Sequence, residues 1–541
     1  MDLIDLSIFQ GEIPRVSDKL LPVENASEAS NCRLESGRLE PISGVSVVEA
    51  GVGSSIQTIY KMAAQFLRWS SPVNVVKSLV ADSGNRVFYT GDSYPKDTNG
   101  ALALASSPYP AASRRLGIPA PTGALAITLT GTAGADVEKS SSWVYTIVGK
   151  WADGSEVESA PSPPTAVVDI YSGITPRLTG FTAPTATGAY ATHFRIYRLM
   201  AGTVGAEYQY VDEMTTATTQ FDDTVSDGDL GEVIPSTLWD APADALDGII
   251  ATSHGMVAGF KGNTIYPSEI YIPYAFPSSY TLVTESDIVG LGYTGSMIMA
   301  LTKTVPYLLT GQDPATISLN RLGYQQPCIA SKSIVNVPGG VVYASPDGLF
   351  MINESGVGAL ITRDVFTKSQ WKSLGPANLI GFYYDDAYYG FFSGTVNGFR
   401  FNLGSGDYQP IEMPEKIYGG HYSPDDDLLY LIQENGATRD IVSWDTGALM
   451  DYAWTSKTFS FSGQKIYTAA MVQGDFSQGD VTLDFLVDGV SVGAKTISSD
   501  GEFRIKPKRG NDFEVKLTGK ATIDRVVIAE SMFDVLEAVH G

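Results

Sequence analysis

The sequence predicts an all-β protein assembled from short strands and tight turns. Its 541 residues include 28 Tyr, 22 Phe and 55 Gly, a composition that suits pleated strands joined by turns better than helices. Hydrophobic residues make up 43% of the chain and charged residues 18%, so the chain can bury several cores. At this length we expect three or four domains.

The stretch at residues 341–361 shows the repeating unit most clearly. Two apolar runs flank the turn at residues 345–348, and a third run follows a second turn. Pro346 presets φ to about −65° at the second position of the first turn, and Gly348 tolerates positive φ. Three short strands joined in this way make most of one blade of a β-propeller.

The same rhythm recurs on both sides of this stretch. Residues 1–117 predict the first part of a β-propeller, and residues 239–456 predict the remainder. A blade length of about 40–50 residues gives roughly six to eight blades. The Pro-, Ala- and Ser-rich segment at residues 106–122 has the composition of a linker and marks a boundary.

Residues 118–238 predict a β-sandwich inserted between two blades. Large and small strand-forming residues alternate over residues 143–149, and further strands are expected at residues 193–198 and 208–211. Short strands with Pro-rich joins are typical of an immunoglobulin or fibronectin-III-like β-sandwich. They are equally typical of other seven-stranded sandwiches.

The two ends of the chain complete the prediction. Residues 457–541 are expected to form a C-terminal β-rich domain that ends in a short helix at residues 532–539. Near the N-terminus, residues 21–32 predict one or two helical turns, with Pro22 in the first turn where its missing N–H costs little. Residues 33–41 predict a hairpin around Ser36 and Gly37.

The charge of the chain limits its partners. The formal net charge is −24 and the pI is near 4.5, whereas binding the outside of DNA normally needs a basic face. The same charge would suit a channel through which DNA must pass without sticking. Acidity that only keeps a large assembly soluble is an equal alternative.

Two cysteines, Cys32 and Cys328, are too few for a disulfide framework. The first residues show no signal-peptide pattern, and no apolar run approaches the roughly 20 residues of a membrane span. We therefore expect a chain made in a reducing cytoplasm, with no membrane insertion of its own.

Two acidic segments and one basic cluster are the candidate site residues. The acidic ones are Asp222, Asp223, Asp227 and Asp229 in one segment and Asp425, Asp426 and Asp427 in the other. Neither segment has the ligand pattern of a calcium loop, and both could be ordinary hairpin tips. The basic cluster, Lys506, Lys508 and Arg509, lies beside Phe503 and could protect a strand edge or contact a partner.

No residues with the pattern of a catalytic or metal site are found. The four histidines are scattered singly, and no nucleophile elbow or phosphate-binding loop is present. A pair of carboxylates for glycoside hydrolysis can always be chosen among 60 acidic residues, so such a pair carries no information. We expect no catalytic residues, no metal and no cofactor.

Several motifs, taken in order, resemble the tail nozzle proteins (tail tubular protein B) of short-tailed bacteriophages. Each motif alone consists of residues that are common in turns and strands. Together the motifs span roughly 450 residues in the order in which they occur in that family. They are Ser30-Asn31 followed by Leu34, Gly37, Leu39 and Pro41; Arg115 to Pro121; Glu158 to Pro161 with Arg195 to Arg198; Tyr307 to Gly311; Tyr343 to Leu349; and Trp454 to Lys457.

This resemblance implies a structural virion protein without enzyme activity. The chain would form a homohexameric ring at the end of the short tail, bound to the adaptor ring below the portal and carrying tail fibres or spikes. Double-stranded DNA would pass through its lumen without sequence-specific binding, and the acidic segments named above are candidates for lumen-facing loops. The ring would be assembled in the cytoplasm of the bacterial host.

Two other classes remain open at the level of sequence. The first is a carbohydrate-binding or hydrolysing β-propeller that acts at a cell surface. Sialidase-type propellers repeat a Ser-x-Asp-x-Gly-x-Thr-Trp turn, and residues 345–348 begin in this way only once. The second is a generic scaffold for protein–protein contacts, because neither fold specifies a function.

Overall fold

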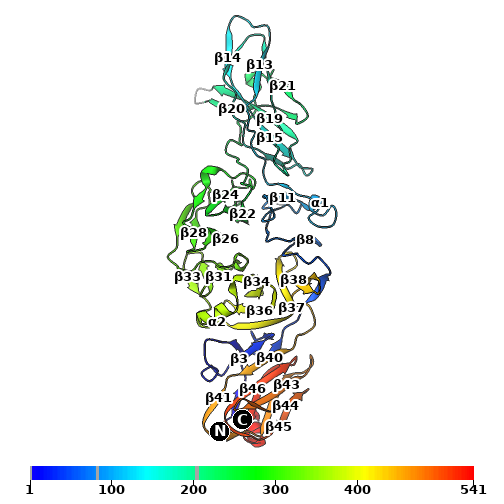
Figure 1. The fold of residues 1–541 in the computed structure, drawn as a ribbon, viewed down its shortest axis with the longest axis vertical. Helices are drawn as coiled ribbons and strands as arrows, with labels where there is room; N and C mark the ends of the chain where they lie inside the picture. The colour runs from blue at the N-terminus through cyan, green and yellow to red at the C-terminus, as the bar shows by residue number, and fades with distance from the viewer. Residues whose placement is uncertain (1–2, 81–83, 202–205, 296, 541) are drawn as a thin grey trace. The chain divides into compact units, whose positions relative to one another are not determined.

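The structure, a computed structural model, describes residues 3–80, 84–201, 206–295 and 297–540. It is almost entirely β-strands and turns, which confirms the predicted all-β class (Figure 1). The chain forms two compact units. The first contains residues 1–59, 303–306 and 322–541, and the second contains residues 60–302 and 307–321.

Four-stranded antiparallel sheets of the propeller type recur in the second unit. Neighbouring strands are consecutive in the sequence, as in a meander. The sheets are β9 (Asn74–Lys77), β10 (Val87–Thr90), β11 (Lys96–Thr98) and β12 (Arg114–Arg115); β22 (Asp247–Ala251), β23 (Val257–Lys261), β24 (Thr264–Pro267) and β25 (Leu282–Val283); and β26 (Ile288–Thr294), β27 (Met297–Thr302), β28 (Tyr307–Thr310) and β29 (Ser318–Arg321). A hairpin of β7 (Thr58–Met62) and β8 (Gln65–Trp69) precedes them.

The predicted blade at residues 341–361 is confirmed in the first unit. It consists of β30 (Val335–Val337), β31 (Gly340–Ser345), β32 (Gly348–Asn353) and β33 (Gly358–Leu360). Gly348 has a φ of +153°, and a Cβ there would lie 2.3 Å from the Thr362 hydroxyl oxygen. The turn between β31 and β32 therefore requires glycine. Trp371 of α2 (Lys368–Ser373) is fully buried and donates from Nε1 to the Ser345 carbonyl at 2.8 Å.

Two further blades of the first unit share one long strand. Their strands are β34 (Leu379–Tyr384), β35 (Ala387–Phe392), β36 (Thr395–Asn402), β37 (Tyr408–Ser423), β38 (Leu428–Asn435), β39 (Thr438–Ser443) and β6 (Ser46–Glu49). The first half of β37 pairs with β36 and the second half pairs with β38. β6 completes the second blade from nearly 400 residues away, by pairing with β39.

Two facing sets of strands between residues 126 and 222 form a β-sandwich in the second unit. One sheet contains β16 (Glu156–Glu158), β15 (Trp143–Lys150), β19 (His193–Ala201) and β20 (Ala206–Thr215). The others contain β13 (Ala126–Gly131), β18 (Ile174–Thr179) and β21 (Gln220–Asp222), and β14 (Val137–Ser141) with β17 (Val168–Tyr171). Trp143, Tyr145, Leu178 and Phe194 share one core between these sheets.

The C-terminal domain is a second sandwich, and both ends of the chain build it. One sheet contains β1 (Ile4–Leu6), β47 (Thr522–Ala529), β42 (Ala469–Asp475) and β45 (Gly501–Arg504). The other contains β2 (Gln10–Glu12), β3 (Asn25–Ser30), β40 (Tyr452–Ser456), β41 (Phe459–Ile466), β46 (Arg509–Gly519), β43 (Val481–Val487) and β44 (Val490–Ile497). Phe9, Trp454, Tyr467 and Phe513 lie in its core.

This arrangement differs from the expectation that residues 1–117 begin the propeller. β1, β2 and β3 belong to the C-terminal sandwich, because β47 and β40 supply their pairing partners. The helical turns predicted for residues 21–32 are also wrong, since residues 25–30 form β3. Backbone pairing with a strand more than 400 residues away outweighs the local helix signal there.

Two other predictions near the chain ends are confirmed. β4 (Cys32–Arg33) and β5 (Glu40–Pro41) form the expected hairpin, with Gly37 at a φ of +80° in its turn. The C-terminal helix is α3 (Met532–His540). None of the helices in the described part of the chain has the length and apolar character needed to cross a bilayer.

Candidate functional site

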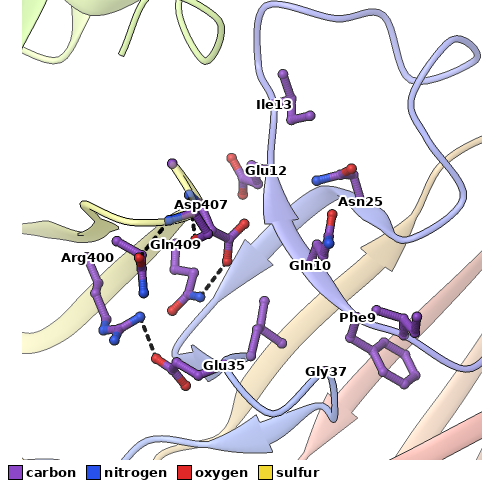
Figure 2. Close-up of a pocket in the computed structure, with 15 residues that line it drawn as sticks. Phe9, Gln10, Glu12, Ile13, Asn25, Glu35, Gly37, Arg400, Asp407 and Gln409 are labelled. Atoms are coloured by element: carbon purple, nitrogen blue, oxygen red, sulfur yellow. Dashed lines mark hydrogen bonds and ion pairs between the residues drawn. The ribbon is translucent and has the colours of Figure 1, made fainter. Parts of the chain in front are cut away.

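A polar pocket of about 380 Å³ lies in the first unit beside β2 and the loop that follows β36 (Figure 2). Side chains from distant parts of the sequence face it. The polar ones include Glu12, Asn25, Glu35, Arg400, Asp407 and Gln409. The pocket therefore depends on the long-range strand pairing that brings the N-terminal segment to this sheet.

Asp407 connects the loop to the N-terminal strand. The side chain of Asn402 accepts hydrogen bonds from the backbone N–H groups of Gly404 and Ser405, both at 2.9 Å, and so shapes the loop. Asp407 then accepts from the backbone N–H of Gly11 at 2.8 Å. A Cβ at Gly11 would lie 2.1 Å from the Tyr408 carbonyl oxygen, so this close approach requires glycine.

Glu12 is the titratable group of the pocket that changes charge near neutral pH. Its Oε1 accepts a hydrogen bond from the backbone N–H of Ala29 at 2.6 Å. Burial of the carboxyl group raises the pKa of Glu12 to about 7, although the bond from Ala29 opposes this shift. Burial also raises the pKa of the nearby Cys32 thiol, so that thiol stays protonated.

Arg400 and Gln409 form the opposite wall (Figure 2). Arg400 is ion-paired with Glu35, and its Nε donates to the Tyr389 hydroxyl at 3.2 Å. Gln409 is buried and donates from Nε2 to Asp407 at 2.7 Å. Its Oε1 accepts no hydrogen bond from any residue that the structure describes. The wall thus presents both donors and acceptors of hydrogen bonds.

The chemistry available in this pocket is hydrogen bonding, with one carboxyl group that titrates near pH 7. Amide, carboxylate and guanidinium groups at this density suit a small polar ligand. Among the residues that the structure describes, no three or more His, Cys, Asp or Glu side chains are grouped so that they could hold a metal ion.

The first predicted acidic segment is neutralised within its own sandwich. Asp222 is ion-paired with Arg177, with a distance of 2.6 Å between Oδ1 and Nε. Asp227 is ion-paired with Lys139 and Arg198, and Asp229 accepts from the Ser226 hydroxyl. Asp222 and Asp227 thus have cationic partners within the sandwich, whereas Asp229 is exposed and accepts only from a hydroxyl among the described residues.

The prediction that Asp223 faces a channel is wrong, because the side chain of Asp223 is fully buried. Its Oδ2 accepts hydrogen bonds from Trp143 Nε1 and from Arg198 Nη1, both at 2.8 Å. Arg198 is itself only 2% exposed, so the two opposite charges leave water together. A residue buried in this way cannot face a channel.

The second predicted segment, Asp425 to Asp427, is exposed on the turn between β37 and β38. The hydroxyl of Tyr422 donates to Asp427 at 2.8 Å, and that of Tyr430 donates to Asp426. In the neighbouring turn between β34 and β35, the hydroxyl of Tyr383 donates to Asp386 at 2.7 Å.

These two turns lie together, since the rings of Tyr384 and Tyr422 are 6.1 Å apart between centroids. Burial raises the pKa of Tyr384, and the charges of Asp445, Asp385 and Asp427 add to this shift. We call Asp385, Asp386, Asp425, Asp426 and Asp427 the acidic tips. The sequence shows a tyrosine followed by aspartates at each of the two turns, but it does not show that the two turns lie close together.

The predicted basic cluster begins in the loop between β45 and β46. Lys508 donates from Nζ to the Val487 carbonyl at 3.2 Å and so supports the neighbouring strand. Lys506 and Arg509 are exposed. Phe503 is buried, with Lys495 Nζ 4.2 Å from its ring centroid. Contact with a partner stays a prediction for this cluster.

Five residues of this pocket are not predicted by any sequence pattern, namely Glu12, Glu35, Arg400, Asp407 and Gln409. The turn-forming run Gly404 to Asp407 was the one local signal for part of this set. The N-terminal members lie nearly 400 residues from the others and carry no motif. They could be found only by knowing that β2 and β3 belong to the sheet that contains β40, and not to a propeller blade.

Comparison with known proteins identifies no family for this chain. No family model matches it, and no curated protein matches it. Solved structures with some similarity include the Pan2 WD40 domain of Neurospora crassa (9% identity, 50% of this chain, 85% of that chain, TM-score 0.26) and the AfRom2 CNH domain (9%, 59%, 93%, 0.26). An exo-beta-1,3-galactanase of Phanerochaete chrysosporium is a third (10%, 52%, 95%, 0.21).

Proposed function

We propose that this chain is a structural virion protein, the hexameric nozzle at the distal end of a short phage tail. In that role six copies form a conduit and gate for genome ejection. The ring attaches to the adaptor below the portal and offers an attachment point for tail fibres or spikes. It performs no catalysis and holds no cofactor.

The order of the domains carries this proposal. Propeller-type sheets are interrupted by one sandwich, and a second sandwich follows that both chain ends complete. The motifs of the nozzle family occur in the corresponding order, from Ser30-Asn31 to Trp454-Lys457. Pairing of β1 with β47 fastens the two ends into one sandwich, which suits a component that transmits mechanical load.

The net charge gives secondary support. A net charge of −24 would repel the phosphate backbone and reduce adhesion of DNA to a channel wall. Ion pairs within the sandwich neutralise Asp222, Asp223 and Asp227 of the first acidic segment, so the wall would draw mainly on other acidic residues.

Co-assembly with a portal–adaptor complex tests the proposal. We expect the purified chain to co-sediment with that complex in a ratio of six copies to one adaptor ring, and not with the portal alone. A chain that stays monomeric and does not bind the adaptor would contradict it. An isolated adaptor ring serves as the control that locates the docking surface.

A second candidate function is carbohydrate binding, and the pocket beside β2 is the observation that favours it. Its volume of about 380 Å³ lies within the range of about 300–1,000 Å³ that is common for small-ligand sites. Its carboxylates and amides can pair with sugar hydroxyls. A glycan array probed with the wild type and with Asp407→Ala would decide, since this function requires binding that the variant loses.

A further inference from the structure

A second pocket in the first unit, of about 700 Å³, is cationic although the chain as a whole is acidic. Residues of β32, β33 and α2 line it, together with the segment at residues 323–326. The basic side chains among its lining residues are Arg15, Arg363 and Lys368, and the one carboxylate is Asp347. Lys368 Nζ lies 2.7 Å from Asp347 Oδ1, so that pair is neutral.

The two arginines of this pocket are held side by side and are not ion-paired. Arg15 donates from Nη1 to the backbone carbonyl of Arg363 at 2.6 Å. Neither guanidinium has a carboxylate partner within the described ranges. Other arginines of the described chain do have such partners; they include Arg33, Arg86, Arg177, Arg195, Arg198 and Arg525.

Aromatic side chains complete the pocket. The rings of Tyr324 and Phe350 are 5.4 Å apart between centroids, and Phe366 is buried beside them. The Tyr324 hydroxyl accepts a hydrogen bond from the backbone N–H of Gly358 at 2.9 Å, so its ring is fixed. A pocket lined by unpaired guanidinium groups and by aromatic rings suits a ligand that brings both carboxylates and aromatic side chains.

We infer that this cationic pocket receives the acidic tips of a second copy of the chain. The tips offer what the pocket lacks, namely exposed carboxylates at turns, with tyrosine hydroxyls that donate to Asp386 and Asp427. Figure 1 shows β33 and α2, which contribute to the pocket, on one side of the first unit and β38, which follows the second tip, on the other.

A contact between two different surfaces repeats from copy to copy and closes into a ring when the rotation permits. The inference therefore rests on the proposed ring and names the contact that holds it together. It also assigns Asp425, Asp426 and Asp427 to the boundary between copies instead of the channel wall.

Charge reversal tests this contact in the full-length chain. The pocket variant is Arg15→Glu with Arg363→Glu, and the tip variant is Asp425→Lys with Asp426→Lys. We expect each variant alone to associate at least about tenfold more weakly than the wild type when mass is measured by light scattering against concentration. The control, Lys495→Glu with Arg504→Glu, reverses two exposed cations outside the pocket and outside the basic cluster. It changes the net charge as much as the pocket variant does and should keep the wild-type mass.

Mixing separates this contact from a general effect of charge. A pocket variant keeps its tips, a tip variant keeps its pocket, and the reversed tips complement the reversed pocket, so an equimolar mixture should recover the association that each variant alone has lost. A chain that combines both sets of reversals should associate again. Far-ultraviolet circular dichroism verifies that each variant is folded.

The outcomes distinguish this inference from the proposed function. If the pocket variant still forms the ring, or if the control loses association equally, the inference is wrong and the nozzle proposal stands. If the wild type associates through the pocket but ignores the adaptor, the inference stands and the nozzle proposal fails. If the wild type remains monomeric in the presence of the adaptor, both are wrong.

Discussion

The two acidic segments of this chain look alike in sequence and have opposite fates in the structure. Asp222, Asp223 and Asp227 are ion-paired inside the inserted sandwich, with Arg177, Arg198 and Lys139 as their partners. Asp426 and Asp427 stay at an exposed turn and accept hydrogen bonds from tyrosine hydroxyls. The difference lies in the neighbouring strands, and not in the acidic residues themselves.

This comparison separates charge that stabilises the fold from charge that is offered to a partner. A buried carboxylate that pairs with a buried guanidinium is costly to disturb, because removal of either group leaves an uncompensated charge. An exposed carboxylate at a turn contributes little to folding and much to the surface potential. Variants of Asp223, of Glu12 and of the acidic tips test this separation.

The largest expected effect is that of Asp223→Ala, which leaves Arg198 buried without its main partner. We expect the sandwich to lose about 3–5 kcal/mol of its free energy of unfolding. Hydrogen exchange of peptides from β15 and β19 measures the loss. Asp229→Ala, an exposed carboxylate of the same segment, is the matched control, and equal losses in the two variants would contradict the account.

A double variant sharpens this result. Combining Asp223→Leu with Arg198→Met removes both buried charges, so it should cost much less than Asp223→Ala alone. A double variant that is as unstable as the single one would show that the packing of these side chains, and not their charge, is what matters.

Glu12 provides a buried carboxyl group for which the described residues supply no cationic partner, so the stability of the terminal sandwich should depend on pH. Burial raises its pKa in the folded chain to about 7, from an ordinary value of 4.5. Between these pH values the unfolded chain loses the proton and the folded chain keeps it, so stability is full below pH 4.5 and falls until about pH 7. The expected total is about 3 kcal/mol.

Glu12→Gln should remove this dependence and make the terminal sandwich more stable than the wild type at pH 8, with little change at pH 4. Gln can still accept the hydrogen bond from Ala29. Hydrogen exchange of peptides from β2 and β3, corrected for the intrinsic rates, measures it. Parallel pH profiles of the wild type and the variant would contradict a buried, titrating Glu12.

The smallest effect on folding is expected at the acidic tips. Tyr422→Phe removes the hydrogen bond to Asp427 and should cost less than about 1 kcal/mol. Asp425→Asn, Asp426→Asn and Asp427→Asn together should leave the exchange of β37 and β38 nearly unchanged, while they weaken association between copies. A large loss of protection in these strands would place the tips with the structural carboxylates.

Local signals in the sequence predicted the elements whose partners are near in the chain. The blade at residues 341–361 is confirmed because its strands pair with their immediate neighbours across turns that Pro346 and Gly348 determine. The hairpin at residues 33–41 is confirmed for the same reason. Each depends on turn chemistry that a short window of sequence contains.

Long-range pairing is what the sequence could not supply. The local sequence of β3 predicts a helical turn, but the segment forms a strand because it pairs with β40. Glu12 and Asp407 share a pocket although they lie nearly 400 residues apart. Asp223 is ion-paired with Arg198 on β19, and nothing in the sequence of the acidic segment indicates this pairing.

The most direct test of the nozzle proposal is an electron cryo-microscopy map of the chain assembled on a portal–adaptor complex. The account predicts a six-fold ring below the adaptor, with the acidic tips of each copy in the cationic pocket of its neighbour. A map that shows no ring on the adaptor, or isolated copies with a glycan in the pocket beside β2, would contradict it.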